Sequence, residues 1–209
     1  AGGDAVFTVV SMQEPAGGED WDVAAFPSVY RGTAQGGNPT TDSGMPARVG
    51  DITSVLTGLS TNALSTTYTG NTTYDVYFTD SPTYTGGGPD TYLMVWFHAF
   101  GMNPITTGGY TCGADPPLYT SACTDGGTVT FRGKEFVRFV GTNWTTPVIS
   151  YLPVTRMETW EFDLNDFIAD AVAQGVITDD MYLQSIQAGF ELISGGAGLA
   201  VNEFYAVIE

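Results

Sequence analysis

Short apolar or alternating runs, separated by turn-forming residues, dominate this chain of 209 residues. Glycine-rich turn signals recur between the runs, and neither an internal repeat nor a linker divides them. Many short strands with short connections are typical of an all-β sandwich or jelly roll. The sequence therefore predicts a single all-β domain over residues 1–209. The expected strands are 6–12, 26–30, 74–79, 92–100, 128–132, 136–140, 148–152, 182–192 and 199–208.

One segment, at about 164–173, carries a helical pattern instead. Its apolar residues recur at the i, i+3, i+4, i+7 spacing that places them on one helix face. They are Leu164, Phe167, Ile168, Ala171 and Val172. Asp163 stands where an N-cap belongs, and Gly175 follows the last expected turn. We expect one amphipathic helix whose apolar face packs against a sheet.

The segment 92–98 is the most informative strand, because its two faces differ in character. Side chains alternate between faces with a period of two. Leu93, Val95 and Phe97 form one apolar face that suits a core, while the other face mixes aromatic and polar groups. That second set is Tyr92, Met94, Trp96 and His98. Such a face suits carbohydrate binding, and it also suits a fully buried strand in which His98 is a structural imidazole.

A second strand, at 183–191, carries a candidate acid. Its polar face presents Gln187, a candidate carbohydrate-binding residue, and Glu191. A carboxyl among apolar neighbours has a raised pKa, as a general acid requires. The alternative is a glutamate that faces solvent.

Charge and composition narrow the classes of partner. The formal net charge of −17 argues against nucleic acid and against an anionic membrane surface, and it does not repel a neutral polysaccharide. No stretch is long and apolar enough for membrane insertion. Two cysteines and one histidine fall short of a zinc ligand set, so we expect no metal and no cofactor.

Cys112 and Cys123 enclose ten residues rich in turn formers. A short polar loop with a cysteine at each end predicts a disulfide and hence an oxidising compartment. We therefore expect a secreted, extracellular or cell-surface protein.

Several stretches together resemble glycoside hydrolase family 12, the family of endo-β-1,4-glucanases. The likeness runs in order from about residue 6 to residue 209. It is carried by 23–32, Ser43-Gly44-Met45-Pro46, 74–78, 92–96, 162–168, 188–192 and 195–199. The resemblance implies a concanavalin-like, two-sheet β-jelly roll with one helix.

The resemblance also implies residue roles. The family cleaves β-glucans with retention, which needs a nucleophile and an acid/base about 5–5.5 Å apart. Glu191 matches the acid/base, Asp75 matches the aspartate that supports the nucleophile, and Met94 and Trp96 match residues of the cleft floor. Tyr92 stands at the position of the nucleophilic glutamate.

Three hypotheses follow. The first is a catalytically degenerate protein, or pseudoenzyme, that binds a β-glucan-type polysaccharide or serves as an extracellular structural protein. The second is an active endo-β-1,4-glucanase with Glu191 as acid/base and Asp90 as an alternative carboxylate. The third is a self-assembling surface or filament subunit. The family's first N-terminal strands have no counterpart before residue 6, so either this sequence is a piece of a longer chain or the sandwich lacks one or two strands. In the second case, strand addition at the edge left open would join the subunits.

Overall fold

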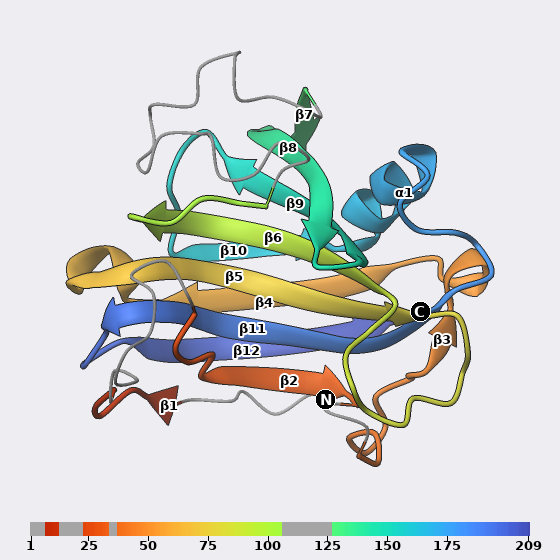
Figure 1. The fold of residues 1–209 in the computed structure, drawn as a ribbon, viewed down its shortest axis with the longest axis horizontal. Coiled ribbons are helices and arrows are strands. Elements are labelled where there is room, and N and C mark those ends of the chain that lie inside the picture. The colour runs from red at the N-terminus through yellow and green to blue at the C-terminus, as the bar shows by residue number, and fades with distance from the viewer. Residues whose placement is uncertain (1–6, 13–22, 34–36, 106–126) are drawn as a thin grey trace.

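The computed structural model describes residues 7–12, 23–33, 37–105 and 127–209. Two sheets pack face to face with one helix at the side, which confirms the predicted β-jelly-roll sandwich (Figure 1). The smaller sheet runs β1 (Phe7–Thr8), β12 (Ala200–Ile208), β4 (Val55–Thr61) and β10 (Thr159–Asp163). The larger sheet runs β2 (Ser28–Gly32), β11 (Tyr182–Gly195), β5 (Tyr68–Thr79), β6 (Thr91–Phe100), β9 (Thr146–Pro153), β8 (Lys134–Asn143) and β7 (Thr128–Phe131). The short strand β3 (Ala47–Arg48) also pairs with β11.

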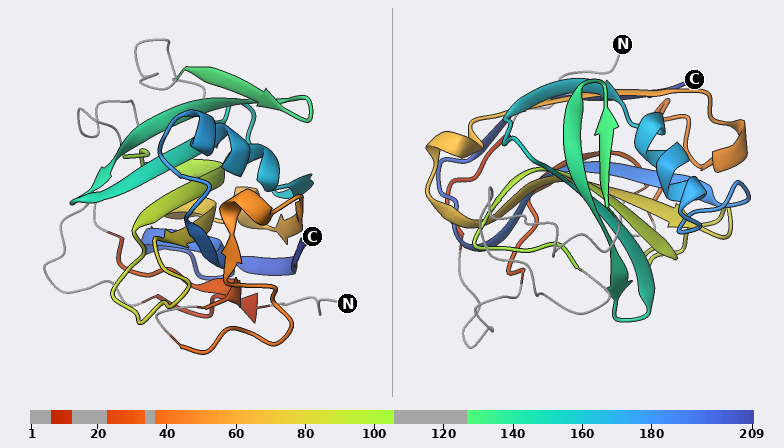
Figure 2. Two further views of the ribbon diagram at one scale, coloured as in Figure 1. Left: turned by 90° about the vertical axis from the view of Figure 1, so that its right-hand side faces the viewer. Right: turned by 90° about the horizontal axis from the view of Figure 1, so that it is seen from above.

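The main core lies between the two sheets, which Figure 2 shows edge-on as separate layers. Alternate residues of β5, β6 and β11 point inward and are fully or almost fully buried, as period-two alternation requires. They meet inward residues of the smaller sheet, such as Leu59 and Phe204. The inward set of the larger sheet is Tyr74, Val76, Phe78, Leu93, Val95, Phe97, Ile186, Ala188 and Phe190.

The predicted helix is confirmed as α1 (Asn165–Ala173). Its residue Phe167 packs edge-on against Phe136 and Tyr151 of β8 and β9. The N-cap is Leu164, so the expected N-cap role of Asp163 is wrong; Asp163 precedes the cap and accepts a hydrogen bond from the backbone N–H of Asn165 at 3.0 Å. The helix is fixed to the sheet by its apolar face and by an ion pair, since Arg138 binds Asp170 at 2.7 Å.

Three strands, β3, β4 and β10, lie in stretches that the sequence pattern did not single out. β4 contains Gly58 and several hydroxyl residues, so it lacks a continuous apolar run. β10 follows a stretch without strand character and precedes the helix directly. Cys112 and Cys123 lie outside the described residues, so their disulfide stays a prediction. The predicted strand addition at an open edge also stays a prediction.

The described part of the chain contains no helix that is long and apolar enough to cross a membrane. Within the same residues, no cluster of histidine, cysteine and acidic side chains has the arrangement of a metal site.

Candidate functional site

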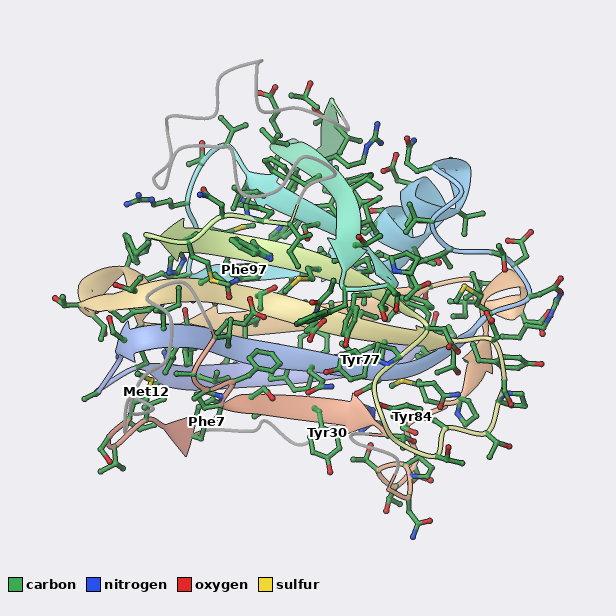
Figure 3. The ribbon with its side chains drawn as sticks, in the orientation of Figure 1. Phe7, Met12, Tyr30, Tyr77, Tyr84 and Phe97 are labelled. Carbon is green, nitrogen blue, oxygen red and sulfur yellow. The ribbon has the colours of Figure 1, made fainter. Side chains whose placement is uncertain are left out.

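The candidate site lies on the outer face of the larger sheet, which we define as the face turned away from the smaller sheet. Three neighbouring strands, β11, β5 and β6, carry the predicted residues. Gln187, Asp75 and Met94 stand side by side in one row across these strands. Figure 3 labels Tyr77, the residue two positions beyond Asp75, near the C-terminal end of β5. Alternation therefore gathers the predicted residues of the three strands on one surface, with His98 as the exception.

Glu191 is held by the amide of Asn71, which lies opposite it on β5. The Asn71 Nδ2 donates to the Glu191 carboxylate, and the Asn71 Oδ1 accepts the backbone N–H of Glu191 at 3.4 Å. Burial raises the pKa of Glu191 to about 7, although the hydrogen bond from Asn71 favours the carboxylate. A carboxyl group with this pKa can donate a proton near neutral pH.

Asp75 is buried and incompletely paired. Its side chain is 7% exposed, and its Oδ1 has no hydrogen-bond partner. Burial raises the pKa of Asp75 well above its usual value, and the charge of Glu191 adds to this effect, while a hydrogen bond with Tyr77 opposes it. Within β11, β5 and β6, Asp75 and Glu191 are the two acidic residues. The charge of Glu191 thus acts on Asp75 across the outer face.

Tyr92 lies opposite Tyr77, and the two rings meet edge-to-face at 5.4 Å between centroids. Burial raises the pKa of Tyr92 to about 12, and the charge of Asp75 contributes. Tyr92 pairs with Tyr77 of β5, which lies two positions after Asp75. Glu191 pairs with Asn71 of β5, which lies four positions before Asp75. Asp75 therefore stands between Tyr92 and Glu191.

Met94 and Trp96 are on the outer face and are almost closed from solvent, at 8% and 2% exposure. They pack in a second apolar cluster with outward residues of β8 and β9, including Phe139 and Leu152. The indole Nε1 of Trp96 is buried without a hydrogen-bond partner. The β6–β9–β8 part of the outer face is thus apolar, while the β11–β5 part is polar.

His98 does not share the face of Tyr92, in contrast to the expected alternation. A β-bulge shifts the β5–β6 register between Thr72 and Thr73, so the alternation breaks before His98. The imidazole is 0% exposed, its Nδ1 donates to the carbonyl of Met157 at 3.2 Å, and its Nε2 accepts from the Tyr68 hydroxyl at 2.6 Å. Burial lowers the pKa of His98 to about 4. This side chain leaves no surface for a sugar to contact.

Asp90 also lies away from the outer face of β6, which begins at Thr91. It is exposed in the loop between β5 and β6, and its Oδ2 accepts the backbone N–H of Asp80 at 2.8 Å. The continuation of the strand through Asp90, which would have aligned its carboxylate with Tyr92, does not occur.

The structure adds residues that sequence reasoning missed. Tyr30 of β2 lies opposite Gln187 and is 45% exposed, and Asn71 and Tyr77 of β5 hold the acidic pair. Asn71 lies before the predicted segment 74–79, because β5 begins at Tyr68, whereas Tyr30 and Tyr77 lie within the predicted strands. Period-two alternation with Gln187 and Asp75 would have pointed to these residues if the pairing of the strands had been known.

The fold is therefore a two-sheet β-jelly roll that carries a carboxyl of raised pKa on the outer face of its larger sheet. The model of glycosyl hydrolase family 12 matches residues 5–209, and the chain belongs to that family.

Individual relatives agree with this assignment. The chain is 31% identical over 165 residues to the probable cellulase Cel12b of Mycobacterium tuberculosis, covering 78% of this chain and 97% of that protein. It is 28% identical over 167 residues to xyloglucan-specific endo-β-1,4-glucanase A of Aspergillus aculeatus, covering 78% of this chain and 63% of that protein. It therefore spans less than two thirds of the fungal protein. The solved structure of endoglucanase cel12A from Rhodothermus marinus superposes with a TM-score of 0.78 at 28% identity, covering 99% of this chain and 82% of that one.

Proposed function

We propose that this protein binds a β-glucan chain on the outer face of the larger sheet without cleaving it by the covalent route of the family. The proposal rests on the chemistry of Tyr92. Its phenol has a pKa of about 12, so it stays protonated at neutral pH. An oxygen nucleophile reacts in its ionised form or beside a base that takes its proton. The charge of the neighbouring Asp75 further disfavours the ionised phenol.

The unpaired Oδ1 of Asp75 supports the loss of the nucleophile. In the family, the matching aspartate supports the nucleophilic glutamate, and here that position holds a tyrosine. A buried carboxyl oxygen without a partner is uncommon and calls for a cause. The substitution at Tyr92 provides one, because it removes the group that Asp75 would support.

Binding remains feasible on the same surface. Glu191 and Gln187 offer polar groups for sugar hydroxyls, and the exposed ring of Tyr30 offers an apolar surface for pyranose C–H groups. A neutral glucan also meets no electrostatic repulsion from an acidic protein. We further propose that the protein is secreted, as the predicted Cys112–Cys123 bridge requires an oxidising compartment.

The test combines binding and turnover. The wild type, Tyr92→Glu and Glu191→Gln are incubated with barley β-glucan, carboxymethylcellulose and xyloglucan, and reducing ends and calorimetric binding are measured. Tyr205→Glu, which adds a carboxylate on the smaller sheet, is the matched control. We expect the wild type to bind at least one glucan without releasing reducing ends. Turnover that Glu191→Gln abolishes, or the absence of binding to all three polymers, would overturn the proposal.

A second candidate is a hydrolase that uses Glu191 as acid and another carboxyl as base. The pKa of about 7 at Glu191 favours it. Asp75 is the other acidic residue of β11, β5 and β6. A pair spaced for an intervening water inverts the anomeric centre. This candidate predicts turnover that Asp75→Asn and Glu191→Gln each abolish, with the α-anomer as first product in NMR spectra.

A further inference from the structure

Trp144 is an exposed aromatic at the tip of the β8–β9 hairpin, and its side chain is 95% exposed. The last pair of the hairpin is Asn143 with Thr146, so Trp144 is the first of two residues in the turn. Full exposure of an indole gives no burial energy to the folded state. Packing within the described residues therefore does not account for a tryptophan here.

The backbone of this residue is also unfavourable for a large side chain. Trp144 has a φ of 57°, in the left-handed region that favours glycine. Two-residue hairpins commonly place glycine at this first central position. A strained residue that gains nothing from burial points toward a role outside folding.

The hairpin lies next to the candidate site. β9 runs parallel to β6, and Val148 stands beside Tyr92. Trp144 precedes Val148 by four residues, so the tip lies beyond Tyr92, at the end of the outer face that is remote from Glu191. Figure 2 (right) shows the β8–β9 hairpin projecting past β5 and β6 on the side away from the smaller sheet. The tip thus stands forward of the outer face.

We propose that Trp144 is a carbohydrate-contact residue that packs on a pyranose ring of the glucan bound on the outer face. This inference rests on the proposed function. Sugar C–H groups pack on aromatic rings, and an indole offers the largest such surface among side chains. At about 3.3 Å per strand residue, Trp144 lies roughly 13 Å along β9 from the row of Tyr92. Only an extended oligosaccharide or polymer reaches both ends of this site.

The experiment compares variants that separate the ring from the backbone. Trp144→Gly removes the ring and relieves the positive φ, and Trp144→Phe keeps an aromatic ring. The control is Arg132→Gly, because Arg132 has a φ of 49° in the β7–β8 turn and carries no aromatic ring. Production in bacteria keeps the Asn143-Trp144-Thr145 sequon free of glycan. Binding to barley β-glucan, cellohexaose and cellotriose is measured by calorimetry, with thermal unfolding in parallel.

We expect Trp144→Gly to weaken binding of β-glucan and cellohexaose about three- to ten-fold, as an aromatic contact of ordinary strength implies. Cellotriose binding should change less, because a short ligand does not span the site. The midpoint of unfolding should rise by roughly 2–4 °C in Trp144→Gly, since strain is removed. Trp144→Phe and Arg132→Gly should bind within about two-fold of the wild type, a change too small to count as a lost contact.

If Trp144→Gly leaves glucan binding unchanged while the separate variant Tyr30→Ala weakens it, this inference is overturned and the proposed function stands. A Trp144→Gly effect on sedimentation without an effect on glucan affinity would assign the ring to self-contact and would also overturn it. A wild type that binds no glucan would overturn the proposed function itself.

Discussion

Asp75 and His98 are buried titratable residues on neighbouring strands of the same sheet, and they differ in how their polar atoms are satisfied. His98, on the inner side, uses both ring nitrogens in hydrogen bonds to Met157 and Tyr68. Asp75, on the outer face, keeps an oxygen with no partner. Buried polar groups in folded proteins are nearly always paired. The comparison therefore indicates that His98 has a structural role, whereas Asp75 is held at a binding surface.

Burial acts on both residues by disfavouring their charged forms, so their pKa values move in opposite directions. The pKa of His98 falls to about 4, whereas the pKa values of Asp75 and of its neighbour Glu191 rise. The interior side of the sheet thus resists protonation and the outer face resists deprotonation. The stability of the two regions should respond oppositely to pH.

The largest expected effect on stability comes from replacing His98 and Asp75 by residues that do not titrate. His98→Ala should lower the free energy of unfolding by about 2–4 kcal/mol, because it opens a cavity, leaves the Met157 carbonyl without the imidazole donor and leaves the Tyr68 hydroxyl with Thr72 alone. Asp75→Asn should change it by less than about 1 kcal/mol, because it removes a carboxyl that is already incompletely paired. Urea titrations followed by tryptophan fluorescence measure both. Equal losses in the two variants would remove the distinction between the regions.

A second prediction concerns pH. Glu191 has a folded-state pKa of about 7 against a usual 4.5, so its contribution to stability is full below pH 4.5 and is lost as pH rises toward 7. His98 has a folded-state pKa of about 4 against 6.5, so its contribution is full above pH 6.5 and is lost as pH falls toward 4. The two contributions oppose each other, and the wild-type profile should be shallow between these limits.

Glu191→Gln exposes the histidine contribution, since a glutamine does not titrate. Its free energy of unfolding, relative to the wild type, should rise by about 3 kcal/mol from pH 4.5 to pH 7, as a shift of this size implies. Urea titrations at three pH values suffice. Parallel profiles for the variant and the wild type would mean that the carboxyl of Glu191 is not held in its neutral form.

The same comparison shows what sequence patterns could and could not predict. Period two along β6 correctly placed Tyr92, Met94 and Trp96 on one face, because the strand is regular there. It failed at His98, because a bulge adds one residue to β6 and sequence alternation carries no sign of it. The helix was predictable from its apolar spacing alone. The interior position of His98 depends on the neighbouring strand, which local patterns do not specify.

Sequence patterns also failed to predict which residues pair across neighbouring strands. Asn71 holds Glu191 only because β5 and β11 pair in one particular register. The same register brings Asp75 within electrostatic range of Glu191. Register depends on turns and on long-range packing, and a one-residue shift would turn every side chain to the other face. Asp75 and Glu191 could therefore be predicted from the sequence as site residues, but the effect of Glu191 on Asp75 could not.

The smallest effect is expected at the rim of the outer face. Tyr30 lies opposite Gln187 on the edge strand β2 and is 45% exposed, so its ring has room to contact a glucan. Tyr30→Ala should weaken glucan binding about three- to five-fold, the range for one partly exposed aromatic contact, and should leave stability nearly unchanged. Tyr30→Phe keeps the ring and should bind as the wild type does, which separates ring packing from a hydroxyl hydrogen bond. If calorimetry finds the affinity of Tyr30→Ala unaltered, the glucan does not extend over β2, and the binding surface narrows to β11, β5 and β6.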